Sequence, residues 1–184
     1  NSAAARTSWL ASCGIQAPQF FEGLEAIPAN TNLHGVAGIL PGGLIVYDIS
    51  SSQAAFVRNS SSYFGGSTPI GTRAIAHNEK PWLVLDFSAM PVDYVGGWDI
   101  DHTGTAVLVT FADGSTFSAR LDGSNNGANL AEFWGLWRND QPRIKSVQFD
   151  ASGDGEWGLD SLEFGRIGAT VSGQVELLDF VGTV

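Results

Sequence analysis

Residues 105–121 read TAVLVTFADGSTFSARL. Alternate residues are apolar on both sides of the Asp113-Gly114 pair, and an Asp-Gly pair between two alternating runs is a strong hairpin signal. In such a hairpin Phe111, Phe117 and Leu121 face the protein interior. The stretch therefore predicts two antiparallel strands joined by a tight turn.

Short apolar runs of the same kind fill most of the remaining chain. Glycine accounts for 23 of the 184 residues, above the usual ~7%, and the glycines separate these runs as turns do in all-β proteins. The further expected strands are 19–24, 35–40, 44–49, 53–58, 82–87, 133–137, 144–149, 157–164 and 171–180. Strand-sized runs without a long amphipathic helix predict an all-β fold, an antiparallel β-sandwich of the jelly-roll kind.

The two ends of the chain differ from this pattern. Residues 2–12 are rich in alanine and place Trp9, Leu10 and Cys13 near one face, which predicts a short N-terminal helix. The expected organisation is a helical extension over 1–18, a sandwich over 19–165 and an additional strand in 166–184. Both ends carry apolar residues that need cover, so we expect at least one of them to pack on this domain or on a neighbouring subunit.

Composition excludes several classes of partner. The 19 acidic and 9 basic residues give a formal net charge of −10, which opposes binding to nucleic acids and to anionic lipid surfaces. Cys13 is the single cysteine, so there is no internal disulfide and no cysteine metal cluster. The sequence contains no run of eighteen apolar residues, so it predicts no membrane-spanning helix. The acidic, lysine-poor composition is typical of secreted, cell-surface or periplasmic bacterial proteins.

A series of motifs resembles a known kind of domain. They are FEGL at 21–24, PWLVLDFS at 81–88, PVDYVG at 91–96, the 107–121 hairpin, FWGL at 133–136, IKSVQF at 144–149 and WGLDSLEFG at 157–165. In this order they resemble the secreted bacterial jelly-roll or galactose-binding-like β-sandwich found in PEP-CTERM-type exported proteins and in carbohydrate-binding modules. The chain departs from that pattern at both ends and lacks a C-terminal sorting motif.

Aromatic residues beside polar ones indicate a sugar-binding surface. Pyranose rings stack on exposed aromatic rings, while Asn, Asp and Arg side chains hydrogen-bond the hydroxyl groups. Trp137, Arg138, Asn139 and Asp140 offer this chemistry in one segment, and Trp157 offers it in another. The alternative is that most of the tryptophans fill the core, with one or two exposed.

A calcium loop is a second expectation. Asp150, Ser152 and Asp154 lie in the sequence DASGDG, which fits a loosened start of a calcium-binding loop. The twelfth position is Ser161 rather than glutamate, and no helix pair flanks the loop, so an EF-hand is excluded. A solvated acidic hairpin without calcium explains the same residues.

The resemblance implies another calcium position. Galactose-binding-like sandwiches often hold a structural calcium between an acidic residue of an early strand and an aspartate of a late one, and Glu22 and Asp160 occupy comparable places. Asp160 lies in an apolar strand, and a buried carboxylate needs a partner. A cation or backbone donors would serve equally.

Two classes of function follow. The first is a non-catalytic extracellular module that binds glycans and is stabilised by calcium. The alternative is a structural or accessory subunit of a surface assembly, which binds another surface protein through residues 2–12 or 171–181. An enzyme is not expected, because Asp99 and Asp101 are the nearest approach to a paired-carboxylate site and an acidic strand end explains them better.

Overall fold

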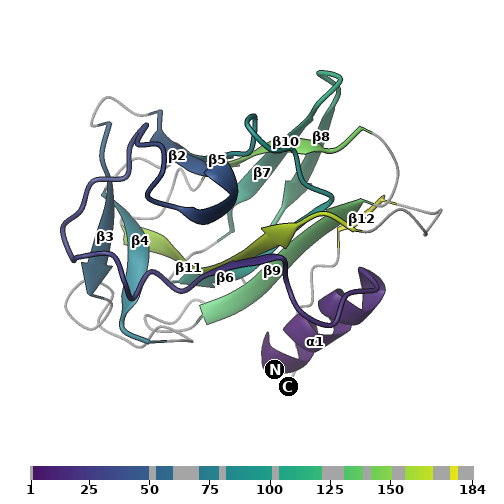
Figure 1. Cartoon of the computed structure of the whole chain (residues 1–184), viewed down its shortest axis with the longest axis horizontal. Helices are drawn as coiled ribbons and strands as arrows, with labels where there is room; N and C mark the ends of the chain where they lie inside the picture. The colour runs from purple at the N-terminus through teal and green to yellow at the C-terminus, as the bar shows by residue number, and fades with distance from the viewer. Residues whose placement is uncertain are drawn as a thin grey trace.

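The described residues form an antiparallel β-sandwich with one α-helix, α1 (Ser2–Ser12), near the N-terminus and a single 3-10 turn, η1 (Pro41–Gly43) (Figure 1). The computed structural model describes residues 2–49, 53–59, 71–78, 82–100, 104–121, 131–138, 142–150, 156–167 and 175–177. The all-β class and the N-terminal helix expected from the sequence are confirmed.

One sheet has seven strands, in the order β12-β9-β6-β11-β4-β3, with β1 paired to β11. The strands are β1 (Phe20–Glu22), β3 (Ala55–Asn59), β4 (Arg73–Asn78), β6 (Tyr94–Ile100), β9 (Ala131–Arg138), β11 (Glu156–Gly165) and β12 (Val175–Leu177). A bulge in β11 between Asp160 and Glu163 leaves Ser161 with a φ of 52°. Because the bulge adds residues on one strand, Asp160 and Glu163 both lie on the outer face.

The other sheet has five strands, in the order β2-β5-β10-β7-β8. They are β2 (Ile45–Asp48), β5 (Trp82–Asp86), β7 (Ala106–Phe111), β8 (Thr116–Arg120) and β10 (Ile144–Asp150). Along β5, β7 and β10 buried residues alternate with more exposed ones. This alternation is that of a sheet with one face on the core and one toward water.

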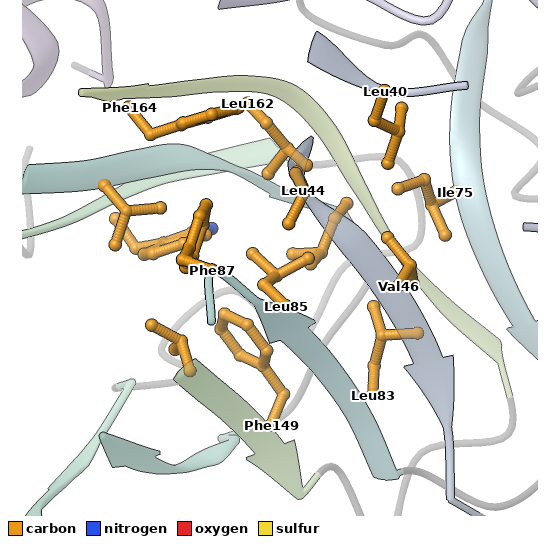
Figure 2. Close-up of a cluster of buried hydrophobic side chains, with 14 of the residues drawn as sticks. Leu40, Leu44, Val46, Ile75, Leu83, Leu85, Phe87, Phe149, Leu162 and Phe164 are labelled. Carbon is orange, nitrogen blue, oxygen red and sulfur yellow. The ribbon is translucent and has the colours of Figure 1, made fainter. Parts of the chain in front are cut away.

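The main core fills the space between the two sheets. Figure 2 shows Leu83, Leu85 and Phe149 of the five-stranded sheet facing Leu162 and Phe164 of the seven-stranded one. All five side chains are fully or almost fully buried. Burial of apolar area on this scale is the main stabilising term of a domain of this size.

The predicted hairpin is present as β7 and β8. Val109 pairs with Phe117, and the Phe111 N–H donates to the Ser115 carbonyl to close the turn. Phe111 and Leu121 are buried, and Phe117 packs against the core from a partly exposed position. The alternation of this stretch therefore predicted the inward face correctly.

Helix α1 covers part of the outer face of the seven-stranded sheet. Trp9 is fully buried there, with Tyr94 and Phe133 as ring neighbours at centroid distances of 5.8 and 5.3 Å. Gly96 and Gly135 face each other across β6 and β9 beneath the indole. Because these glycines have no side chain, the ring can rest directly on the sheet. The N-terminal segment therefore packs on this domain, as one of the two expected outcomes stated.

Some expected strands differ in the structure. Residues 35–40 form turns rather than a strand, because Gly35 and Gly38 have positive φ angles of 68° and 82°. Strands β4 and β6 were not among the expected strands. Strand β6 (Tyr94–Ile100) contains two glycines and is buried throughout. A strand covered on both faces has no alternation to detect. Of the expected 171–180 strand, the structure describes only β12.

Candidate functional site

The five-stranded sheet has an outer face, turned away from the core, that α1 does not cover, because α1 packs on the other sheet (Figure 1). The residues of this face on β5, β7 and β10 are partly or fully exposed, while their sequence neighbours are buried. No helix of the described chain covers this face. We therefore treat it as the candidate binding surface and call it the open face.

Strand register arranges the side chains of the open face in rows. One row contains Trp82, Asp150, Ala106 and Arg120, and the next contains Tyr47, Val84, Gln148, Leu108 and Ser118. Adjacent strands lie about 4.8 Å apart, so five strands give a surface about 19 Å wide. Each row mixes apolar and hydrogen-bonding side chains.

Trp82 is the main aromatic residue of the open face. All six tryptophans lie in the described chain, and five are buried, whereas Trp82 is 40% exposed. The Gln148 side chain lies one row away and forms no hydrogen bond with a described residue. Arg120, three strands from Trp82 in the same row, forms no ion pair with one. An exposed indole beside the amide of Gln148 and the carboxylate of Asp150 provides a stacking surface and hydrogen-bonding groups together.

Contacts at the β2 edge hold the next aromatic ring in place. Tyr47 meets the His34 ring edge-on at a centroid distance of 5.8 Å. His34 is fixed in turn, because its Nδ1 accepts a hydrogen bond from the Asp48 N–H at 3.1 Å. These contacts limit the motion of Tyr47, so a ligand would lose little side-chain entropy by packing on it.

Asp86 lies at the other end of the open face, where β5 ends. It accepts hydrogen bonds from both the backbone N–H and the hydroxyl of Ser88, the first at 2.8 Å. These bonds fix the carboxylate beside Ser146 of β10, which is its register partner. Its remaining lone pairs can accept hydrogen bonds from hydroxyl groups.

The aromatic residues chosen from the sequence occupy other places. Trp157 is buried in the main core and packs against Phe149 at 5.8 Å, so it offers no face to a sugar. Trp137 is 9% exposed within the cluster under α1. Arg138 instead stacks over Phe111, with its guanidinium carbon 4.5 Å from the ring centroid. The predicted sugar site is therefore corrected: its described residues lie on separate faces, because successive residues of a strand point in opposite directions. Asn139 and Asp140 lie outside the described residues.

The metal residues proposed from the sequence do not converge where they are described. Glu22 pairs with Leu162, on the core side of β11, and its carboxylate accepts a hydrogen bond from the Leu24 N–H at 2.6 Å. Asp160 pairs with Trp98, on the outer face. The implied Glu22–Asp160 calcium pair is thus wrong in geometry, because the two side chains leave opposite faces.

The Asp150 loop stays a sequence prediction. Asp150 ends β10 on the open face, and Ser152 and Asp154 lie outside the described residues. Within the described chain, no three His, Cys, Asp or Glu side chains come together as a metal site would require.

Two other candidates are buried. Asp99 pairs with Leu159 on the core side of the sheet, and Asp101 lies outside the described residues. Burial raises the pKa of the Cys13 thiol to about 12. A thiol with this pKa is protonated at neutral pH and is a poor nucleophile.

The open-face residues were missed in the sequence for a physical reason. Trp82 begins a run whose alternation shows that it faces away from Leu83 and Leu85, and this signal was available. The neighbours of Trp82 on the surface, Gln148 and Asp150, come from a strand far along the chain. Sequence spacing does not reveal which strands pair.

Comparisons with known proteins give the following. No family model matches the chain, and no curated protein matches it. A structure of TmCBM61 in complex with beta-1,4-galactotriose has a TM-score of 0.46 and 17% identity, over 67% of this chain and 88% of the other. CsCBM6-3 from Clostridium stercorarium, in complex with cellobiose, has a TM-score of 0.37 and 14% identity, over 66% and 86%.

A larger enzyme also has a similar region. It is a glycoside hydrolase family 43 arabinoxylan arabinofuranohydrolase from Bacillus subtilis, with a TM-score of 0.40, 13% identity and coverage of 76% of this chain and 28% of the other. At such TM-scores none of these likenesses establishes a shared site or ligand. In the described chain, no helix has the length and apolar character needed to cross a membrane.

Proposed function

We propose that the protein is a non-catalytic glycan-binding module whose binding surface is the open face. The observation that carries the proposal is the exposed Trp82 indole, which lies in register with Asp150 and one row from Gln148. A pyranose stacks its apolar face on an indole and presents hydroxyl groups at its edges. The Gln148 amide and the Asp150 carboxylate next to Trp82, and the Arg120 guanidinium three strands away in the same row, match those hydroxyl groups.

The dimensions of the surface favour an oligosaccharide over a single sugar. The row that begins at Tyr47 crosses five strands, about 19 Å, and the row next to it runs over four strands from Trp82 to Arg120. A half-polar face whose rows run across the strands suits a chain that lies across it. Hydrolysis is not proposed, because the described part of the open face holds no pair of carboxylates facing each other across a cleft.

The accessory-subunit alternative is less favoured. It required an exposed apolar face on residues 2–12, yet Trp9, Leu10 and Cys13 are buried against this chain's own sheet. The alternative also allowed an exposed apolar face on residues 171–181, but most of these residues lie outside the described part of the chain. A mass measurement in solution addresses this alternative directly, since it predicts a stable assembly.

Location and calcium remain part of the proposal. We place the module outside the cell or at the cell surface, on the basis of the sequence resemblance and acidic composition. Calcium in the Asp150 to Gly155 segment would support the adjacent edge of the open face.

The test is binding of soluble polysaccharides by affinity electrophoresis, followed by calorimetry with oligosaccharides of the polysaccharide that binds. We expect Trp82→Ala to abolish detectable binding and Gln148→Ala to weaken it about tenfold, as loss of one buried hydrogen bond does. Both positions are on the surface, so the melting temperature should change little.

Phe21→Ala is the matched control, because Phe21 is an exposed aromatic residue on the other sheet. It should leave binding of neutral glycans unchanged. The proposal is overturned if Trp82→Ala binds as tightly as the wild type, if no polysaccharide of a broad neutral panel binds, or if the protein releases reducing ends from the glycan it binds.

A further inference from the structure

A groove separates helix α1 from strand β1 on the outer face of the seven-stranded sheet. It has a volume of about 720 Å³, and its walls include Arg6, Pro18, Phe21 and Trp98. The open face lies on the opposite sheet, so this groove is a separate feature. Its size would accommodate one or two sugar rings.

One guanidinium is held in the wall of the groove. Arg6 Nε donates to Oε1 of Glu163, a side chain that is fully buried on β11. The Arg6 side chain is 32% exposed, and its two Nη groups bond no described residue. The ion pair therefore fixes the orientation of Arg6 through one N–H and leaves the outer edge of the fork available.

An exposed aromatic ring lies beside this ion pair. Phe21 pairs directly with Glu163 across β1 and β11, and its side chain is 45% exposed. Directly opposite residues of an antiparallel pair have Cβ atoms about 5 Å apart. Pro18 extends the apolar surface next to Phe21. The groove thus combines a positioned guanidinium edge with an apolar wall.

We propose that this groove binds a sugar acid, with the ligand carboxylate on the Arg6 Nη edge and the pyranose ring against Phe21 and Pro18. The free edge of a guanidinium presents two parallel N–H donors, which match the two oxygens of a carboxylate. A neutral sugar lacks the carboxylate that the Arg6 edge binds. The two requirements together select a uronate over either a neutral glycan or a simple carboxylate.

The test uses digalacturonate, its methyl ester and acetate as probes, followed by calorimetry and by the ¹⁵N-resolved signals of the Arg6 Nε–H and the Trp98 indole. Digalacturonate should bind and shift both signals. The ester and acetate should each bind at least about tenfold more weakly, since one lacks the charge and the other lacks the ring.

Variants separate the two contacts. Arg6→Lys keeps the positive charge beside Glu163 but lacks the fork, and it should bind digalacturonate about tenfold more weakly. Phe21→Ala should weaken binding about fivefold. Because Arg6 also pairs with a buried carboxylate, the dispersion of the amide spectrum checks that Arg6→Lys is folded. Phe21 is exposed, so its variant tests the site without that concern.

Trp82→Ala, on the open face, should leave digalacturonate binding unchanged. If neutral glycans fail to bind but digalacturonate binds in this way, the proposed function is wrong and the sugar-acid groove stands. The groove proposal is overturned if digalacturonate does not bind, if its ester or acetate binds equally well, or if Arg6→Lys and Phe21→Ala have no effect.

Discussion

At the scale of single residues, Glu163 is a carboxylate that the fold buries beside one arginine. It is fully buried, with Arg6 as its ion-pair partner and Oε2 without a hydrogen bond. Burial raises its pKa, while the hydrogen bond and charge of Arg6 lower it, and the net shift is upward. A carboxyl group with a raised pKa is a source of pH-dependent stability, because the folded state holds its proton to a higher pH than the unfolded chain does.

The sign of this effect gives a prediction. Stability from Glu163 is fully present below the unfolded pKa of about 4.3 and is lost as the pH rises through the folded pKa. Glu163→Gln cannot titrate, so it should gain stability relative to the wild type as the pH rises above about 4.3. Urea unfolding at several pH values above this one measures the difference.

Glu25 provides a control of opposite sign. Slight burial raises its pKa, but the N–H groups of Thr72 and Arg73 donate to its carboxylate and together lower the pKa by more, so the net shift is downward. Its stability contribution is present above the unfolded pKa and is lost as the pH falls. Glu25→Gln should therefore lose stability relative to the wild type as the pH rises. Equal slopes for the two variants would contradict the assignment.

At the scale of elements, the contact between α1 and the sheet depends on two paired glycines. A Cβ on Gly96 would lie 2.9 Å from the Trp9 ring, and a Cβ on Gly135 would overlap the indole. Helices of eleven residues are marginal alone, so packing of Trp9 is what holds α1 in place. The wall of the sugar-acid groove depends on the same contact.

Gly135→Ala should accordingly destabilise the protein by about 1–3 kcal/mol, the usual cost of overpacking. The measurement is the free energy of unfolding in urea, with hydrogen exchange of α1 amides as a local readout. Gly23→Ala is the matched control: its Cβ would lie 3.3 Å from the exposed Phe21 ring, which can move. That change should stay within about 0.5 kcal/mol. Equal stability of both variants would mean that Trp9 does not rest on Gly135.

At the scale of the whole molecule, the two sheets separate two kinds of surface. The outer face of the seven-stranded sheet carries α1 and the groove, and the outer face of the five-stranded sheet carries the open rows of side chains (Figure 1). The core between them fixes the positions of both. A ligand that binds only the folded state stabilises the whole sandwich by mass action.

Calcium is the ligand for which this gives a prediction. If residues 150–155 bind it, calcium at about 100 times its dissociation constant adds about 2.7 kcal/mol, or about 5–10 °C in a domain of this size. Thermal unfolding with excess calcium and with chelator measures the shift. Asp154→Asn should remove the shift and Asp160→Asn should retain it, since Asp160 and Glu22 leave opposite faces. An unchanged melting temperature would contradict the calcium loop.

The sequence alone determined the local features of this protein. The alternation in residues 105–121 placed Phe111 and Leu121 inward, and the apolar spacing in residues 2–12 placed Trp9 and Cys13 on one helix face. The all-β class followed from strand-sized runs between glycines. Each of these depends on residues close together in the chain, and backbone periodicity converts such spacing directly into a face.

Only the tertiary structure decided which tryptophans are covered. Trp157 is covered by the opposite sheet and Trp137 belongs to the cluster beneath α1, whereas Trp82 faces outward from a sheet that α1 does not cover. The open face likewise joins Tyr47, Trp82 and Gln148, and the groove joins Arg6 to Glu163. Such neighbours are set by long-range strand pairing and by how elements pack over one another, and a run of sequence contains neither.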